Sequence, residues 1–391
     1  MNRVVSAPGS QPSLREANSA RIIEAVKAYG RITQVELASV TGLSPATVSN
    51  IVKQLLESGL VETSATTRSG RRAQLVSLRS SSALAVGMHI GRRSLDLVIA
   101  DASLEVLAST RLPLPADHRS DTTLDRAALL VADLADDVGA DMGRVAGVGL
   151  ALPSSVGRGG RTGAFQLPGW EELDVDQLLS ARIERPVLVV KEADAAAMAE
   201  SRLGALRGAS SAIYVHASHT TESSLVLGGL VHAGFRGGAG ALGHVRVDPA
   251  GLICRCGARG CLNTVVSGEA LAESVRVSHG PMDLRAIVKA ARDGDPGCRQ
   301  VVADAGAVVG RALADLATVV APERITWGGD LAGVGETFVG PLREAVRGRP
   351  LLPAVEELLA EPSFPLDGCA RGALVAIHDV IIASATGSVE G

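Results

Sequence analysis

The sequence predicts an α/β multidomain protein in which a small helix-turn-helix module precedes a larger domain built from a duplicated α/β unit. A chain of 391 residues suits two or three domains. Helical periods separated by tight turns fill residues 14–57, and a pattern of strand, hairpin and further strand occurs twice after residue 84. Because 46% of the residues are hydrophobic and only 2% are aromatic, the cores are expected to be aliphatic.

We divide the sequence into a disordered leader (residues 1–13), the helix-turn-helix module (14–78) and the large domain (84–391). The leader contains Arg3 but lacks the apolar block of a signal peptide, and no apolar run is long enough to span a bilayer. We therefore expect a cytoplasmic protein with reduced cysteines and no membrane contact.

Charge is distributed unevenly between these parts. Residues 1–78 carry nine Lys or Arg against five Asp or Glu, so their net charge is +4, and the remainder carries −8. A small basic module on an acidic body is typical of a nucleic-acid-binding head, because neutralising phosphates supplies most non-specific affinity. Charge alone does not distinguish this from a chance fluctuation.

The module should begin with two helices. The first is expected from about Ser19 to Gly30, where a left-handed C-cap glycine is usual. Its buried face carries four residues with helical spacing: Ile22, Ile23, Val26 and Tyr29. A short second helix is expected after Thr33, which forms a capping-box pattern with Glu36, and the turn after this helix contains Gly42.

The third helix has a fixed start, because Ser44 offers a capping hydroxyl and Pro45 suits the first helical turn. Its buried stripe is expected to be Val48, Ile51, Val52, Leu55 and Leu56. The opposite face carries small or polar side chains that fit a DNA major groove without clashing: Ala46, Thr47, Ser49, Asn50 and Lys53.

A basic hairpin follows this helix. Gly59 ends the helix, residues 60–62 begin a strand, and residues 73–78 alternate like its partner. The tip contains Gly70 and three arginines that could reach phosphates or a narrow minor groove: Arg68, Arg71 and Arg72. Together, the short second helix, the tight turn, the polar face and the basic hairpin predict a DNA-binding winged helix-turn-helix. The alternative is a three-helix protein-interaction module.

Strands dominate the start of the large domain. They are expected at residues 84–90, 94–100, 105–109, 145–152 and 187–190, with a helix around residues 124–138. A comparable opening occurs again at residues 212–216, 223–227 and 230–233. The repeat predicts a duplicated architecture with a cleft between its halves.

Several motifs along the chain carry a family resemblance. They are Thr41-Gly42-Leu43-Ser44, Thr47-Val48-Ser49, Leu167-Pro168-Gly169-Trp170, Gly238-Ala239-Gly240, Gly243-His244 and Cys254-x-Cys256-Gly257-x-x-Gly260-Cys261-Leu262. With them the chain, from about Ser13 onward, resembles the ROK family of repressors and sugar kinases, in particular the xylose and N-acetylglucosamine repressor type. The resemblance implies an actin-like, ribonuclease-H-like bilobal sugar-kinase fold behind the winged helix.

The cysteine motif predicts a metal site. One imidazole and three thiolates satisfy tetrahedral zinc and close it to water, so we expect a structural Zn²⁺ on His244, Cys254, Cys256 and Cys261. The same motif in the family supports this. The alternative is a set of buried thiols beside a core histidine. Cys298 and Cys369 stand apart and are expected to be packing residues.

Kinase chemistry is not expected. Sugar kinases of this fold hold ATP phosphates on two glycine-rich hairpins, because glycine lets backbone N–H groups approach closely. Here the corresponding residues 89–93 read His-Ile-Gly-Arg-Arg, and residues 218–224 read Ser-His-Thr-Thr-Glu-Ser-Ser, with Glu222 adding negative charge. We therefore expect no ATP binding and no enzymatic activity, with Arg92 and Arg93 simply solvated.

The sugar site is expected to be degenerate. Where the family has Asn-Asp, with the Asp as general base, this chain has Lys191-Glu192, and the extra methylene moves the carboxylate by roughly an ångström. Two further acids of the family's site correspond to Ala241 and Asn263. No convergent set of polar residues is visible in the sequence, so the effector is either a different, sugar-like polar molecule or absent.

The sequence thus predicts a DNA-binding transcriptional regulator, by family resemblance a repressor, of carbohydrate or secondary-metabolism genes. One winged helix buries too little DNA surface for strong specificity, so we expect a homodimer or tetramer on an inverted-repeat operator in double-stranded DNA. Two alternatives remain: a divergent sugar kinase with a regulatory head, and a protein-interaction module.

Overall fold

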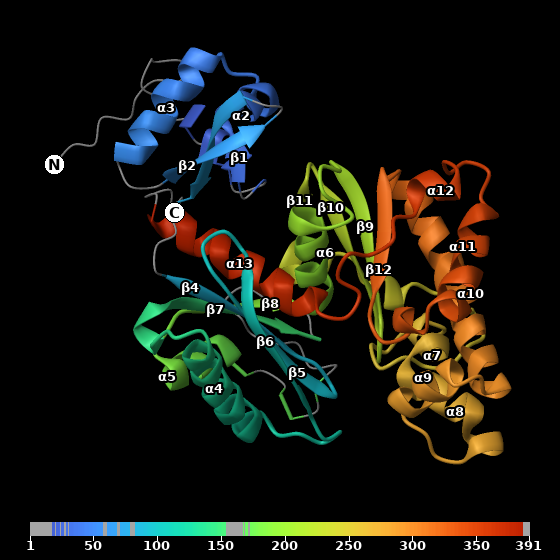
Figure 1. Cartoon of the computed structure of the whole chain (residues 1–391). Coiled ribbons are helices and arrows are strands. Elements are labelled where there is room, and N and C mark those ends of the chain that lie inside the picture. The colour runs from blue at the N-terminus through green and yellow to red at the C-terminus, as the bar shows by residue number, and fades with distance from the viewer. Residues whose placement is uncertain are drawn as a thin grey trace.

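The computed structural model describes residues 31–57, 61–68, 71–78, 83–153 and 173–385, together with residues 18, 19, 21–23, 25, 26, 29, 167, 169 and 170. Outside the described residues lie the leader, Gly30, Gly59, Gly70 and the segment 154–166. Figure 1 shows a small N-terminal module beside a larger domain of two lobes. Among the described helices, none combines the length and apolarity needed to cross a membrane.

The module is a winged helix-turn-helix. The described residues between 18 and 29 are helical. They are followed by β1 (Arg31–Thr33), α2 (Gln34–Thr41), α3 (Pro45–Glu57), β2 (Val61–Arg68) and β3 (Arg71–Leu78). The three strands form an antiparallel sheet in the order β1-β3-β2. The fold predicted for this part of the chain is confirmed.

Local capping fixes where the two helices start. Thr33 Oγ1 accepts a hydrogen bond from the backbone N–H of Glu36 at 3.3 Å, and the Glu36 carboxylate accepts one from the backbone N–H of Thr33 at 2.9 Å. Ser44 Oγ accepts from the backbone N–H of Thr47 at 3.1 Å. Gly42 ends α2 with a φ of 66°, a left-handed conformation that suits glycine. The predicted capping box and N-cap are therefore confirmed.

Two residues expected in the core of the module are exposed. The core contains Ile22, Val26, Leu37, Val48, Ile51, Val52 and Leu55, but Leu56 is 37% exposed and Tyr29 is 47% exposed. Leu56 lies at the edge of the α3 stripe, about 80° around the helix from Val48, where the core no longer reaches. Tyr29 faces the large domain instead, because the Arg207 guanidinium lies 4.6 Å from the centre of its ring.

The first lobe is built on a five-stranded sheet in the order β6-β5-β4-β7-β8. Its strands are β4 (Leu84–Ile90), β5 (Ser94–Ala100), β6 (Val106–Pro113), β7 (Val145–Leu152) and β8 (Val187–Lys191). β4, β7 and β8 run parallel, whereas β5 and β6 are antiparallel neighbours. One face packs against α4 (Ser120–Asp137) and α5 (Val175–Ile183). β6 extends four residues beyond the end expected for it, residue 109.

The second lobe repeats this plan on a smaller sheet in the order β11-β10-β9-β12. Its strands are β9 (Ser211–Ala217), β10 (Thr221–Leu227), β11 (Leu230–Val231) and β12 (Arg324–Gly328), and β12 is parallel to β9. Its outer layer contains α8 (Gly268–His279), α9 (Leu284–Arg292), α10 (Pro296–Val320) and α11 (Glu336–Arg347). Both lobes thus open with an antiparallel meander that gains a parallel strand, which confirms the predicted duplicated, actin-like fold.

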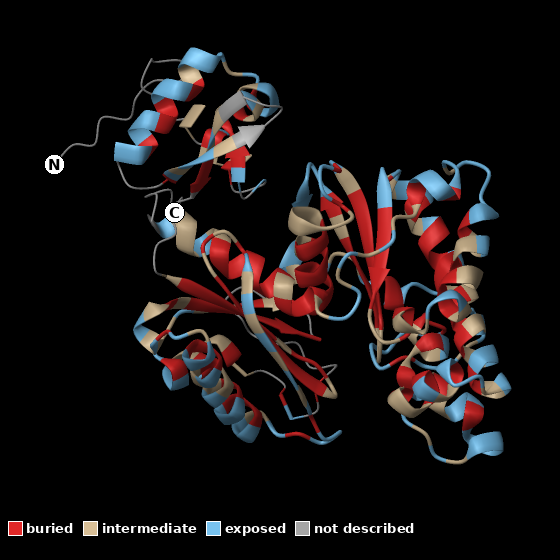
Figure 2. Cartoon of the chain, viewed as in Figure 1, coloured by how far each residue is buried: buried red, intermediate tan, exposed pale blue. Residues whose placement is uncertain are grey.

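Two helices lie between the sheets, α6 (Glu192–Leu203) and α13 (Gly368–Ala385), and they pack against each other. Figure 2 shows that their central parts are buried. The contacts are too close for side chains: a Cβ on Gly149 of β7 would lie 1.9 Å from the carbonyl oxygen of Ala373, and one on Gly372 would lie 1.5 Å from that of Ala195. α13 then continues to the module, where Ile382 packs against the winged-helix core.

Candidate functional sites

The outer face of α3 does not pack against the core of the module. Of the five residues of α3 predicted to read DNA, Thr47 is half-buried. The other four are exposed: Ala46, Ser49, Asn50 and Lys53. The Thr47 hydroxyl is hydrogen-bonded to that of the N-cap residue Ser44, with 2.8 Å between the two oxygen atoms. The polar side chains point away from the buried stripe, so the fold presents them on one surface of a helix with a fixed start.

The hairpin β2–β3 gathers the three predicted wing arginines at one end. The two strands pair from Val61 opposite Leu78 to Arg68 opposite Arg71, and Arg72 is paired with Thr67. The arginine side chains lie outside the described part of the chain, so their backbone positions alone are placed.

A sharp loop brings the predicted metal ligands together. His244 ends the short helix η3 (Leu242–His244), and the three cysteines follow within a turn. In that turn the backbone N–H of Cys254 donates to the carbonyl of Ala258 at 2.7 Å, and Gly257 donates back to Cys254 at 2.9 Å. Gly260 cannot carry a side chain, because a Cβ there would lie 1.5 Å from the carbonyl oxygen of Asp248.

The donor atoms of this loop fit a tetrahedral ion. One ligand atom from each of His244, Cys254, Cys256 and Cys261 lies within 4.8 Å of all the others. Cys254 Sγ is 3.6 Å from His244 Nδ1, and Cys256 Sγ is 3.7 Å from Cys261 Sγ. Tetrahedral zinc with bonds of about 2.3 Å places its sulfur ligands about 3.8 Å apart. We call this group of four residues the knuckle.

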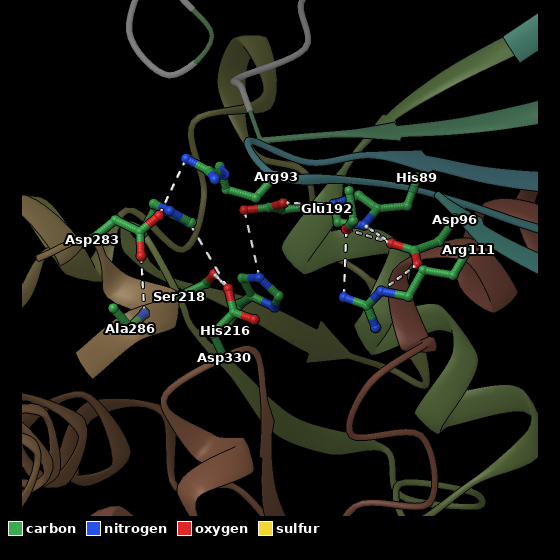
Figure 3. A network of polar contacts seen from close by, with 12 residues as sticks. His89, Arg93, Asp96, Arg111, Glu192, His216, Ser218, Asp283, Ala286 and Asp330 are labelled. Atoms are coloured by element: carbon green, nitrogen blue, oxygen red, sulfur yellow. Dashed lines mark hydrogen bonds and ion pairs between the residues drawn. The ribbon is translucent and has the colours of Figure 1, made fainter. Parts of the chain in front are cut away.

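A cleft between the lobes contains a network of charged side chains. His89, on β4, lies at its centre: Nε2 is 3.0 Å from a carboxylate oxygen of Glu192, and Nδ1 is 3.4 Å from one of Asp96. Asp96 also accepts a hydrogen bond from Ser94 Oγ at 2.8 Å and lies 3.0 Å from Nε of Arg111. Figure 3 shows these side chains converging from β4, β5, β6 and the start of α6.

The second lobe completes the network from the opposite side. His216, on β9, places Nε2 3.6 Å from the other carboxylate oxygen of Glu192. Ser218 Oγ donates to the Asp330 carboxylate at 2.7 Å, and His219 Nδ1 lies 3.8 Å from the same carboxylate. Side chains from both lobes therefore meet around Glu192.

Two arginines of the first lobe cross the cleft. Arg92 lies 3.4 Å from the Glu269 carboxylate, and Arg93 lies 3.2 Å from that of Asp283. The expectation that these arginines are simply solvated is wrong, because the fold places an acid of the other lobe within reach of each. The ion pairs link the lobes at the mouth of the cleft.

Opposite charges hold the buried groups of the network ionised. Burial lowers the pKa of His89, but its contacts with Asp96 and Glu192 outweigh burial and raise that pKa to about 9. Burial favours the neutral acid at Glu192, yet His216 and His89 lower its pKa overall. Asp96 shows the same balance, with His89 and Arg111 lowering its pKa against burial. At neutral pH His89 is a cation between two carboxylates.

The residues at the expected sugar positions are engaged by the protein itself. Lys191 Nζ donates to the carbonyl of Ala239 at 2.7 Å and lies 3.4 Å from Asp194 Oδ1. Asn263 Oδ1 accepts from the backbone N–H of Thr221 at 2.8 Å. Lys191 thus bonds to the second lobe, whereas Asn263 bonds within that lobe.

Sequence reasoning missed the convergent set around His89. Its members come from segments as far apart as residues 89 and 216, so spacing along the chain gives no sign of them. One signal was available: His89 and Asp96 each interrupt an otherwise apolar strand. Because buried polar groups need partners, such interruptions in adjacent strands indicate a shared network.

Comparison with known proteins assigns both parts of the chain. A model described as the ROK family matches residues 85–378, and one described as winged helix-turn-helix DNA-binding matches residues 15–62. The DNA-binding transcriptional dual regulator NagC of Escherichia coli K12 is 27% identical over 356 residues, covering 86% of each chain. The xylose repressor of Caldicellulosiruptor bescii is 22% identical over 373 residues, covering 91% of this chain and 93% of the relative.

Solved structures with this fold include regulators and kinases. A ROK family transcriptional regulator, described as a homologue of E. coli MLC protein, aligns with a TM-score of 0.73 and 25% identity over 96% of this chain and 100% of that one. A ROK family glucokinase from Streptomyces griseus, in complex with glucose and AMPPNP, aligns with a TM-score of 0.64 and 25% identity over 75% of this chain and 98% of its own. The regulator matches nearly the whole chain, whereas the kinase matches about three quarters of it.

Proposed function

The chain belongs to the ROK family, and we propose that it is a transcriptional regulator that binds double-stranded DNA in the cytoplasm and represses carbohydrate or secondary-metabolism genes. The observation that carries this proposal is the winged helix-turn-helix, whose helix α3 presents a polar face opposite its core. The relatives that align along most of the chain include NagC, described as a DNA-binding transcriptional dual regulator, and the xylose repressor.

The two surfaces of the module have different roles in this proposal. Side chains of α3 enter the major groove and read base edges: Ala46, Thr47, Ser49, Asn50 and Lys53. The wing contacts phosphates or a narrow minor groove through Arg68, Arg71 and Arg72. A single module buries too little surface for a specific operator, so the protein acts as a homodimer or a pair of dimers on an inverted repeat.

Selection of genomic fragments by the purified full-length protein at fixed salt tests this function. We expect enrichment of a palindromic site near carbohydrate or secondary-metabolism genes. The double variant R71A/R72A should lose affinity for all fragments and show a shallower dependence on salt, because phosphate contacts are lost. The control R126A/R299A removes two exposed arginines of the large domain and should bind like wild type. Absence of enrichment over random DNA would favour the protein-interaction alternative.

We propose that the cleft does not carry out kinase chemistry. Its two turns, at residues 91–93 and 218–220, read Gly-Arg-Arg and Ser-His-Thr where kinases of this fold have glycine-rich hairpins, and Arg92 and Arg93 are paired with acids of the other lobe. Glu192, in the general-base position, is held by two histidines. We expect no sugar-dependent ADP formation from ATP with hexoses or pentoses, and sugar-dependent turnover would establish the kinase alternative instead.

The knuckle is proposed to hold one structural Zn²⁺. Its three thiolates and one imidazole close a tetrahedral site, and the interatomic distances above fit one. The ion would tie the loop at residues 244–261 to the start of α7 (Asn263–Val266), and thereby to the core of the second lobe.

A further inference from the structure

A second group of metal-ligand side chains lies in the interlobe cleft, separate from the knuckle. His89, the Glu192 carboxylate and Cys369 Sγ each place one ligand atom within 4.8 Å of the other two. Cys369 is 6% exposed and Glu192 5% exposed, so both are buried. We propose that these three residues bind a divalent transition-metal ion, for which Zn²⁺ is the best match to nitrogen, oxygen and sulfur ligands together.

Asp96 prepares His89 for this role. A metal-binding histidine is usually held by a carboxylate on its other ring nitrogen, which fixes both the orientation and the tautomer of the ring. Asp96 lies 3.4 Å from Nδ1 of His89, while Nε2 faces Glu192 at 3.0 Å. Asp96 is itself fixed by Ser94 and Arg111. The ring is therefore oriented before an ion arrives.

His216 is a candidate for a fourth position. Its Nε2 lies 3.6 Å from Glu192, next to the three proposed ligands. It is 6% exposed, and its Nδ1 has no hydrogen-bond partner within the described part of the chain. Nε2, the ring nitrogen that faces Glu192, would supply this fourth ligand, and the unpartnered Nδ1 lies on the other side of the ring.

Metal counting on the full-length protein tests the site without relying on DNA binding. Protein stripped by a chelator is reloaded with Zn²⁺, dialysed, and analysed for zinc per chain. We expect two ions in wild type, one in C369S and E192Q, and one in the knuckle variant C256S. One ion in wild type that is lost in C256S would overturn the proposal, as would two ions in either C369S or E192Q.

A matched control separates this site from another cysteine. Cys298 is also buried and lies near His279 and Asp295. C298S should keep both ions, and loss of the second ion in C298S but not in C369S would overturn the assignment. Cobalt provides the second readout: with zinc in the knuckle, Co²⁺ added to wild type should give a thiolate-to-metal absorption band that C369S lacks. Circular dichroism establishes that each variant is folded, and a folded C369S that keeps the band contradicts the proposal.

Discussion

The knuckle and the cleft contain similar side chains, but the chain assembles them in opposite ways. All four knuckle residues come from one loop between residues 244 and 261, and their spacing alone reveals them. The groups of the cleft come from β4, β5, α6, β9 and the start of α13, so residues 89 and 369 become neighbours only when α13 packs against β4. A locally encoded site can organise early and alone, whereas a site of this second kind depends on the whole fold.

The largest expected effect comes from breaking the locally encoded site. C261S removes one of four zinc ligands and leaves an incomplete tetrahedron, and structural zinc contributes on the order of 10 kcal/mol of binding energy that folding uses. We expect a strong fall in the thermal unfolding temperature and the loss of one zinc ion per chain. C298S, which also changes a buried cysteine, should unfold within a few degrees of wild type. A chelator that leaves the unfolding of wild type unchanged would count against a structural ion.

The next effect concerns the cleft, measured as a function of pH on protein loaded with a single zinc ion per chain, so that the knuckle is filled and the cleft is free of metal. His89 has a folded-state pKa of about 9, above its ordinary value of 6.5. A raised pKa means that its ion pairs stabilise the fold fully below about pH 6.5 and that this contribution is lost as pH rises through about 9. The shift corresponds to about 3 kcal/mol. Urea unfolding at three pH values should show this loss in wild type and not in H89Q.

The matched control for this pH profile is H232Q, which changes an exposed histidine. It should retain the wild-type fall in stability between pH 6.5 and 9. An H89Q protein with the same fall as wild type would show that another group is responsible. Such a result would mean that the ion pairs of His89 do not cause the pH dependence of stability.

A smaller effect is expected on the surface of α3, which resembles the knuckle in being encoded by a short segment. N50A should reduce discrimination between operator and a single-base variant by about 1–3 kcal/mol, because an amide that reads a base edge is lost. Its affinity for random DNA should change little. Competition binding at fixed salt measures both quantities, and Q300A, on the surface of α10, is the control. Equal losses on operator and random DNA would place Asn50 at a phosphate instead.

The smallest effect is local capping. T33A removes the hydroxyl that accepts from the Glu36 backbone and should destabilise the module by about 1 kcal/mol. T318A removes a hydroxyl in the last turn of α10 that bonds back to Ala314, and it should cost less, because that carbonyl also lies within the helix. Chemical denaturation compares the two. A larger loss in T318A would mean that local capping matters less than the sequence pattern indicates.

Prediction from sequence succeeded where a few adjacent residues determine the outcome. The caps at Thr33 and Ser44, the duplicated strand pattern and the proximity of the knuckle residues follow from local spacing, and the structure agrees with each. The base-reading and wing contacts remain predictions, because no nucleic acid defines them. Arg71 and Arg72 in particular are placed by their backbone alone.

Prediction failed where partners come from distant segments. Tyr29 has the spacing of a core residue, but Arg207 of the second lobe lies over its ring and holds it at the surface. Arg92 and Arg93 are on an exposed turn, yet acids almost two hundred residues away pair with them. Cys369 stands alone in the sequence and meets His89 and Glu192 only in the fold. Rules based on spacing along the chain cannot predict contacts between residues that are distant in the sequence.

Helix α13 connects the cleft of the regulator to its DNA-binding module. Its first turn carries Cys369 in the cleft, and its last turns carry Ile382 into the core of the DNA-binding module. Glycine contacts hold its first turns closely against β7 and α6. One continuous helix thus has one end at the cleft and the other at the DNA-binding module, and shortening it from the C-terminus should remove the contact of Ile382 with the module.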